Sequence, residues 1–339
     1  MHRVVVSVLA VGAAITVGLG VTGQRAGAAD ALGHRGYGAF AWGGYSAGGN
    51  PLIDLGRRLF FDTRFSATGG TSCASCHHSD YAYAEPHRTS VFDSGKVGPR
   101  NAPSLLDSRY RSTLMWDGRF HSLEQQVFGP FARGEMGIGI EQAAWRARFD
   151  FQYISLFRTV FNSWPTPDGM ARAIAEYERT LVSRDSRVDR YIAYGDDGAL
   201  SSFERYGLDI FTNRAGCSNC HQLYPYGRNG GPSRPLLSDF RYHNIGTSFR
   251  GGRFVDIGRY ELTGNPADAG AFRTPPLRNS VRSPPYMHDG RFSTLEEVVD
   301  FYDAGGEPNP NLAPEIRPLG LAEREKAALV SFLRALGSY

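Results

Sequence analysis

All four cysteines of this 339-residue chain fall in two copies of the pentapeptide Cys-x-x-Cys-His. Two thiols three residues apart reach the two vinyl groups of one heme, and the histidine that follows places an imidazole under the iron. The sequence therefore predicts two covalently bound c-type hemes. The expected attachment residues are Cys73, Cys76 and His77 in the first copy and Cys217, Cys220 and His221 in the second.

The chain begins with the pattern of a secretory signal. The basic Met1–Arg3 is followed by the apolar stretch Val4–Val21 and by an A-x-A site at Ala26–Ala28. We expect cleavage after Ala28, which gives a signal peptide over residues 1–28 and a periplasmic protein. A retained anchor helix is the alternative, because the apolar stretch approaches spanning length. No later segment carries eighteen consecutive apolar residues, so we expect no membrane span in the mature chain.

Other roles for the cysteines and other classes of partner are less consistent with the sequence. An exported protein with four cysteines ordinarily forms two disulfides, and paired cysteines also bind zinc. The histidine after each pair favours heme attachment over both alternatives. The formal net charge is +3, from 37 basic and 34 acidic residues with no long run of one sign. This balance indicates no nucleic-acid partner.

Two segments with apolar residues at helical spacing each precede one heme motif. They are Leu52–Asp62 and Phe203–Phe211. A short helix that leads into a heme-attachment loop in each half indicates an internal duplication. The turn-rich segment Tyr194–Ser201 is the predicted boundary between the halves. We expect an irregular arm over residues 29–50, an N-terminal cytochrome c-like domain over 51–194 and a C-terminal one over 195–339.

Longer amphipathic patterns predict further helices, and convincing runs of alternating strand residues are absent. These helices are expected over Ile140–Phe149, Gly169–Val182, Leu295–Tyr302 and Ala322–Leu336. The predicted fold is therefore mainly α, with two cytochrome c-like heme domains, long loops and little strand. Burial of a large flat porphyrin is expected to supply much of each core.

A series of longer motifs surrounds the two pentapeptides. They are LGRRLFFDTRFSATGGTSCASCH, GPRNAPSLLD, MWDGRF, LEQQVFGP, GEMG, AGCSNCH, FRYHNIG, FRTPPLRN and PPYMHDGRFSTLEEVVDFY. In content, order and spacing the series resembles the bacterial di-heme cytochrome c peroxidase family, which includes the tryptophan-oxidising enzyme MauG. The resemblance covers the chain from about Pro51 to the C-terminus.

The resemblance implies that the heme on His77 is the site that reacts with hydrogen peroxide. Sixteen residues after His77 lies Asp93, where many peroxidases of the family have a loop histidine that must leave the iron before peroxide binds. The nearest histidines, His78 and His87, fall at other positions. We therefore expect an iron that is open without reductive activation, with His87 as the alternative ligand.

The same resemblance assigns three residues around the hemes. Glu135 is the implied acid and base that moves a proton between the peroxide oxygens, and Gln126 is its distal companion. Trp116 matches the tryptophan that lies between the hemes in the family. An indole has a polarisable ring and an accessible oxidised state, which suit a relay of charge between two irons.

The second heme is expected to have His221 on one face and Tyr302 on the other. Tyr302 lies seventeen residues after Pro285, where the resemblance places a methionine in the peroxidases and a tyrosine in MauG. A phenolate is a harder, anionic donor than a thioether, so it should lower the potential of this heme. Met287 is the alternative ligand, because thioethers also ligate heme iron.

A calcium ion is also implied by the resemblance. Asn101, Ser283 and Pro285 match the positions that hold this ion between the domains in the family. One side-chain oxygen, two backbone carbonyls and water form a reasonable ligand set for calcium. His288 follows in the same segment and either hydrogen-bonds a heme propionate or has a structural role.

Together these features predict a periplasmic di-heme oxidase that uses hydrogen peroxide to form a bis-Fe(IV)-like state. That state would oxidise an aromatic residue, with tryptophan as the expected target, on an exported partner protein. MauG has a surface tryptophan two residues before its second attachment motif, whereas this chain has Ala215. A different exit route for charge is therefore expected. The alternatives are a cytochrome c peroxidase that takes electrons from a small redox protein and an electron-transfer cytochrome without chemistry of its own.

Overall fold

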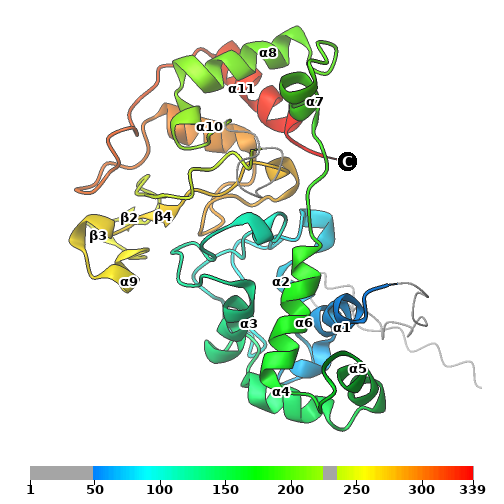
Figure 1. Ribbon diagram of the computed structural model, residues 1–339. Helices are drawn as coiled ribbons and strands as arrows, with labels where there is room; N and C mark the ends of the chain where they lie inside the picture. The colour runs from blue at the N-terminus through cyan, green and yellow to red at the C-terminus, as the bar shows by residue number, and fades with distance from the viewer. Residues whose placement is uncertain (1–48, 224–234, 339) are drawn as a thin grey trace, which may run out of the picture. The chain divides into compact units, whose positions relative to one another are not determined.

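The described part of the chain is built mainly from helices (Figure 1). The computed structural model describes residues 49–223 and 235–338, so the predicted signal peptide and nearly all of the arm lie outside it. The α-helices are α1 (Pro51–Phe61), α2 (Cys73–Cys76), α3 (Leu123–Ala132), α4 (Ile140–Ala147), α5 (Phe151–Phe161), α6 (Pro167–Arg179), α7 (Arg187–Tyr194), α8 (Ser202–Asp209), α9 (Tyr260–Thr263), α10 (Leu295–Asp303) and α11 (Glu323–Ala335).

Strand is confined to short antiparallel pairs among the described residues. The pairs are β1 (Tyr242–His243) with β4 (Phe272–Arg273) and β2 (Phe249–Arg250) with β3 (Arg253–Phe254). The prediction of a mainly α fold with little strand is thus confirmed. Within the described ranges, no helix is long and apolar enough to cross a bilayer.

The predicted helices correspond to α1, α4, α6, α8, α10 and α11, with ends that differ by at most three residues. The start of α6 shows why the ends differ: the Thr166 side chain accepts a hydrogen bond from the Gly169 backbone N–H, and Pro167 occupies the first turn. These are strong helix-start signals that lie before the apolar periodicity. The helices α3, α5 and α7 were not predicted from the sequence. Pro130 lies inside α3, and such a residue ordinarily argues against a helix.

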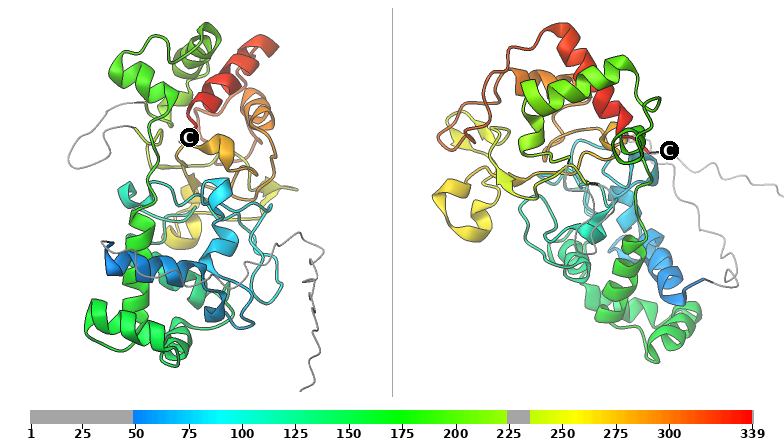
Figure 2. Two further views of the ribbon diagram at one scale, coloured as in Figure 1. Left: turned by 90° about the vertical axis from the view of Figure 1, so that its right-hand side faces the viewer. Right: turned by 45° about the horizontal axis from the view of Figure 1, so that its top comes forward.

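One helix crossing occurs in both halves of the chain. In the first half α1 packs against α6, and in the second α8 packs against α11. The blue α1 crosses the green α6 in both further views (Figure 2). A Cβ atom added to Gly56 would lie 1.8 Å from the carbonyl oxygen of Ala173, and one added to Gly207 would lie 2.0 Å from that of Ala328. Each crossing is therefore so close that only glycine fits.

Aromatic pairs lie one turn further along each crossing. The ring centroids of Phe60 and Tyr177 are 5.2 Å apart, and those of Phe211 and Phe332 are 5.0 Å apart. Both pairs follow the close-contact glycine and alanine by four residues. The matched positions support the internal duplication that the sequence predicts.

The described chain has one large apolar core in each half. The first runs from Leu55 to Leu181, and the second runs from Val188 to Leu336. The change of core therefore falls before α7, which packs with the second core, although the sequence places the boundary after Tyr194. The division into two cytochrome c-like domains stays a prediction.

Candidate active site

Two cavities open beside the two Cys-x-x-Cys-His motifs. The first, here the His77 cavity, has a volume of about 690 Å³, within the range of cofactor sites. The second, here the His221 cavity, has a volume of about 250 Å³. The motif residues Cys73, Cys76 and His77 line the first cavity, and Cys217, Cys220 and His221 line the second. Neither cysteine pair forms a disulfide.

Each motif histidine is held in one tautomer by a backbone carbonyl. The Nδ1 atom of His77 lies 3.0 Å from the Tyr83 oxygen, and Nδ1 of His221 lies 2.9 Å from the Leu237 oxygen. This contact makes Nε2 the nitrogen for a metal, as in metal-ligating histidines generally. Burial lowers the pKa of His77 to about 4 and also lowers the pKa of His221. Both rings are therefore neutral at pH 7, the form that ligates iron.

Gln126 and Glu135 lie in the same cavity as His77. Gln126 projects from α3, whereas Glu135 follows that helix in a turn. The Gln126 Oε1 and Glu135 Oε2 atoms are buried, and neither has a hydrogen-bond partner among the described residues. Burial raises the pKa of Glu135, although the nearby Arg119 opposes the rise. A buried polar atom without a partner is costly, so these two atoms fit a site that receives a polar ligand.

The other candidate positions on this side do not line either cavity. Asp93 accepts hydrogen bonds from the backbone N–H and the hydroxyl of Thr68, each at 2.8 Å, and its own N–H donates to the Glu135 carbonyl. It therefore fixes the loop that carries Glu135. His78 and His87 are also outside the cavity walls. The backbone N–H of His87 donates to Glu85, and its carbonyl accepts from Asn101.

Trp116 lines both cavities. Its indole Nε1 donates to the Asn101 carbonyl at 2.7 Å, and its own carbonyl accepts from the Arg273 N–H at 2.7 Å. The ring lies edge-on to His288, with centroids 6.4 Å apart. His288 in turn stacks on Phe272 at 3.8 Å, and burial lowers the pKa of His288 to about 4. The indole is thus held rigidly between the two sites.

Tyr302 and Met287 both line the His221 cavity. Tyr302 projects from α10 and is half-buried. Burial raises the pKa of its phenol, and the neighbouring Cys217 and Cys220 add to the rise. Deprotonation of this phenol therefore requires a positive charge in the cavity, which a bound metal supplies. The geometry brings both candidate ligands to one site.

The three residues implied for calcium line the same cavity. Asn101, Ser283 and Pro285 all line the His221 cavity. Asn101 is 4% exposed, and its Nδ2 donates to the carbonyls of Glu85 at 3.3 Å and His87 at 2.9 Å. These contacts fix the amide so that Oδ1 is the side-chain oxygen left for a ligand.

Two arginines at the cavities, the buried Arg273 and the half-buried Arg111, were not predicted from the sequence. Arg111 lines both cavities and Arg273 lines the His221 cavity. Among the described residues neither guanidinium is hydrogen-bonded to a carboxylate, and Arg111 Nε and Arg273 Nη1 have no partner. Burial lowers the pKa of Arg111 to about 9 and of Arg273 to about 10. Cationic atoms that are buried without an anion are costly, and heme propionates, when bound, would supply that anion.

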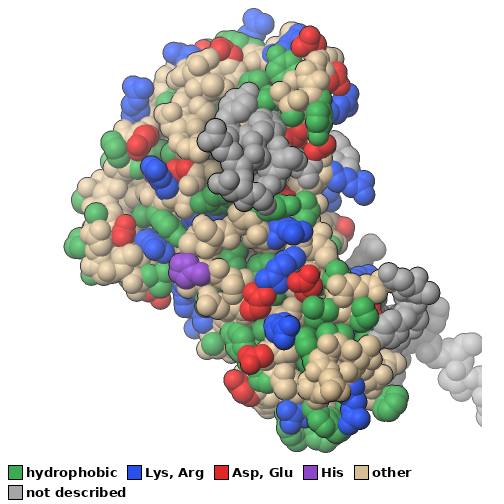
Figure 3. Space-filling model, viewed as in Figure 1, with side chains coloured by type: hydrophobic (Ala, Val, Ile, Leu, Met, Phe, Trp, Pro, Cys, Tyr) green, Lys and Arg blue, Asp and Glu red, His purple; other side chains and the backbone are tan. Residues whose placement is uncertain are grey.

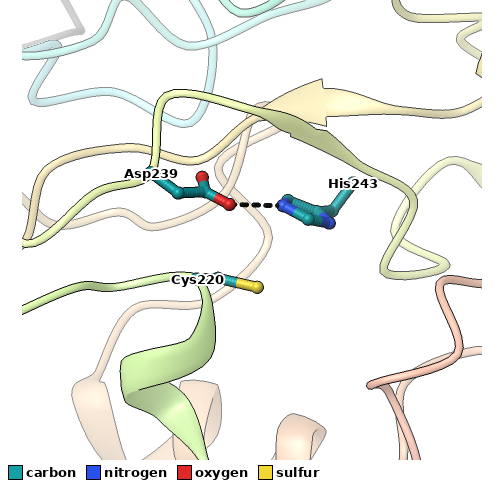
Figure 4. Close-up of side chains that lie close together, drawn as sticks. All are labelled: Cys220, Asp239 and His243. Carbon is teal, nitrogen blue, oxygen red and sulfur yellow. Dashed lines mark hydrogen bonds and ion pairs between the residues drawn. The ribbon is translucent and has the colours of Figure 1, made fainter.

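A cluster of possible metal ligands lies at the edge of the His221 cavity. Within residues 49–223 and 235–338, Cys220, Asp239 and His243 form the one group of three such side chains with ligand atoms within 4.8 Å of one another. Figure 4 shows the Asp239 carboxylate facing the His243 ring, which it contacts at 2.8 Å. Cys220 and Asp239 raise the pKa of His243 to about 9. Because heme attachment would convert the Cys220 thiol to a thioether, the contact that would remain is the one between Asp239 and His243, and the cluster is better explained as this pair beside a heme than as a zinc site.

The fold and its two cavities define a c-type cytochrome with two heme sites. A family model described as di-haem cytochrome c peroxidase matches residues 50–198. The cytochrome-c peroxidase IdrP1 of Pseudomonas sp. strain SCT is 36% identical over 315 residues, covering 84% of this chain and 80% of that protein. The methylamine utilization protein MauG of Methylorubrum extorquens is 35% identical over 295 residues, covering 85% and 79%.

Solved structures agree with this assignment. A MauG-like protein associated with microbial copper homeostasis has a TM-score of 0.75 at 31% identity, covering 86% of this chain and 90% of that one. The diheme peroxidase BthA from Burkholderia thailandensis has a TM-score of 0.73 at 26% identity, covering 86% of each chain. This chain belongs to the di-heme cytochrome c peroxidase and MauG family, whose members are heme oxidoreductases with two c-type hemes.

We predict that Arg273→Gln lowers the midpoint potential of the His221 heme, because a buried positive charge in the cavity wall is lost. The expected change is on the order of 59 mV, which is a tenfold change in a one-electron equilibrium. Spectroelectrochemical titration of the purified cytochrome measures it. Arg253→Gln, an exposed position on β3, is the matched control. An unchanged potential in Arg273→Gln would show that this arginine does not face the heme.

Proposed function

We propose that this protein is a periplasmic, MauG-like oxidase that uses hydrogen peroxide to oxidise an aromatic residue, tryptophan by expectation, on an exported partner protein. The observation that carries the proposal is Tyr302, which projects from α10 into the wall of the His221 cavity. An anionic oxygen ligand lowers the potential of a heme relative to a thioether ligand. A low-potential second heme is suited to hold an oxidising equivalent rather than to accept an electron from a small donor.

The two hemes, when bound, supply iron that reacts with peroxide and holds oxidising equivalents. Glu135 is placed to hold a proton at Oε2 and to transfer it between the two oxygens of the peroxide. Gln126 Oε1 orients the peroxide by accepting one of its hydrogen bonds. Both groups lie in the His77 cavity without competing partners among the described residues, so the site is arranged before peroxide arrives.

Trp116 is the proposed relay between the two sites, because its ring borders both cavities. The hydrogen bond from its Nε1 to Asn101 fixes the ring plane. Ala215 borders the His221 cavity at the position where MauG carries a tryptophan. Charge would therefore leave towards the partner through other groups than in MauG.

The second candidate is a peroxidase that draws electrons from a small redox protein. It is supported by Met287, which lines the same cavity as Tyr302. Relatives named as peroxidases, such as the cytochrome c551 peroxidase of Nitrosomonas europaea at 34% identity, also favour it. The ligand of the second heme separates the two candidates, since methionine ligation raises the potential.

We predict that Tyr302→Met raises the potential of the second heme and slows peroxide-driven oxidation of tryptophanamide, a probe for the unknown partner, by at least about tenfold. This equals about 1.4 kcal/mol in the barrier. Oxidation of a small one-electron donor dye should continue. Met287→Leu is the matched control and should change neither quantity. If Met287→Leu shifts the potential and Tyr302→Met does not, the peroxidase candidate replaces this one.

We also propose that Asn101 Oδ1 and the carbonyls of Ser283 and Pro285 hold one calcium ion. The support is that all three line the His221 cavity, with the Asn101 amide fixed by its Nδ2 hydrogen bonds. The Asn101 carbonyl also accepts a hydrogen bond from the indole N–H of Trp116. An ion that holds Asn101 in place would therefore also hold the Trp116 ring in place.

Calorimetric titration of calcium into the chelator-treated holoprotein tests this site. We expect one ion per chain, and loss of at least about tenfold in affinity, or about 1.4 kcal/mol, in Asn101→Ala. Asn265→Ala, which removes an exposed amide, should bind as the wild type does. Binding that survives in Asn101→Ala would place the ion elsewhere.

A further inference from the structure

A carboxyl group with no role so far lies in the wall of the His77 cavity. Glu178, on α6, lines this cavity together with Gln126 and Glu135. Its side chain is 3% exposed, and its Oε2 atom is buried without a hydrogen-bond partner among the described residues. Acidic side chains are almost never so buried unless they are paired. A buried, unpaired acid in a cofactor cavity is a functional group by default.

The cation next to Glu178 in the chain is hydrogen-bonded to other carboxylates. Arg179, the next residue on α6, is hydrogen-bonded to Glu124 of α3 and to Glu176. Cys73 of α2 is close enough that Glu178 contributes to the raised pKa of its thiol, after burial. Heme attachment turns that thiol into a neutral thioether. Neither of these neighbours therefore gives Glu178 a paired countercharge.

Other titratable groups near Glu178 are the following. The Tyr177 hydroxyl on α6, outside the cavity lining, lies 3.4 Å from that of Tyr83. In the cavity wall Arg100 is paired with Asp117 and Asp256. Arg111 also lines the cavity but is not among the charges that shift the pKa of Glu178. The Arg119 guanidinium is paired with Asp117 and with Glu261 at 3.0 Å. Burial raises the pKa of Glu178 to about 8, with Arg179 opposing and Glu124 adding to the rise. Glu178 is thus a neutral acid at pH 7.

We propose that Glu178 is a redox-linked proton site of the His77 cavity: where the pH is high enough for its carboxyl to be ionised in the oxidised protein, it takes up one proton from water when the iron gains one electron, and releases it when that electron leaves. The electron comes from an external one-electron reductant, and no other bond forms or breaks. In a low-dielectric cavity the added negative charge favours the protonated carboxyl strongly. The proposal goes beyond the proposed function, because it needs only a heme on His77 and is independent of Tyr302 and the partner.

The coupling has a defined sign with pH. Below about pH 8 the carboxyl is protonated in both redox states, so the midpoint potential does not depend on it. Above about pH 8 the oxidised protein has lost the proton and the reduced protein retains it. The potential should therefore fall as the pH rises, by up to about 59 mV for each tenfold fall in proton concentration.

Glu178→Gln tests the proposal, since it keeps the shape of the side chain and removes the titration. The midpoint potential of the His77 heme is measured between about pH 6 and about pH 10, on both sides of the pKa of Glu178. The proteins compared are the wild type, Glu178→Gln and Glu176→Gln. Glu176 is the matched control because it lies on the same helix, near the surface. We expect the fall above pH 8 in the wild type and in Glu176→Gln, and a flat profile in Glu178→Gln.

Two results would overturn the proposal: a fall that persists in Glu178→Gln, or a loss of the fall in Glu176→Gln as well. Glu135→Gln tells the two cavity acids apart, because it should leave the fall in place. If Glu178→Gln does not fold, Glu178→Asp must move the pH at which the fall begins, and an unmoved onset contradicts the proposal. Failure of the tyrosine-ligation test would leave these expectations unchanged.

Discussion

The hydrogen bond between each motif imidazole and a backbone carbonyl is the contact on which the sites depend. For His77 the carbonyl belongs to Tyr83, and for His221 it belongs to Leu237. Each bond fixes Nε2 as the atom that faces a metal, and burial keeps the ring neutral. The two thiols lie within four residues of that ring. The same short segment would therefore determine both the position and the orientation of a heme.

Unpaired polar atoms around the cavities are explained by the same arrangement. Gln126, Glu135 and Arg273 each bury an atom that finds no partner among the described residues. A folded protein avoids such costs unless a ligand meets them. Peroxide in the His77 cavity and a propionate in the His221 cavity are groups of suitable polarity and charge. Buried polar atoms without hydrogen-bond partners distinguish a cofactor site from an ordinary gap in packing, which apolar side chains line.

Charges in the described region are otherwise well matched. On the face shown in Figure 3, basic and acidic side chains are interspersed, as the small net charge leads one to expect. Asp117, for example, is fully buried yet pairs with Arg100 and Arg119. Against this background the uncompensated Arg273 and Glu178 stand apart. Both lie in cavity walls. An anionic group of the cofactor would pair with Arg273, and a proton neutralises Glu178.

Local patterns in the sequence were enough to predict the heme motifs, most of the longer helices and the mainly α fold, because each depends on residues close together in the chain. The pairing of Trp116 with Asn101 and the burial of Glu178 depend on packing between distant segments. No periodicity encodes such contacts. The roles assigned to Tyr302, Glu135 and Gln126 came from the family resemblance, and the structure adds that they line the expected cavities.

The central claim is that the two hemes are unequal, with an open iron on His77 and a six-coordinate iron on His221. Low-temperature electron paramagnetic resonance of the as-isolated ferric protein tests it most directly. The account predicts one high-spin and one low-spin signal of equal weight, with the high-spin signal alone changing when a small anionic ligand such as azide is added. Two low-spin signals, neither of which responds to azide, would contradict it.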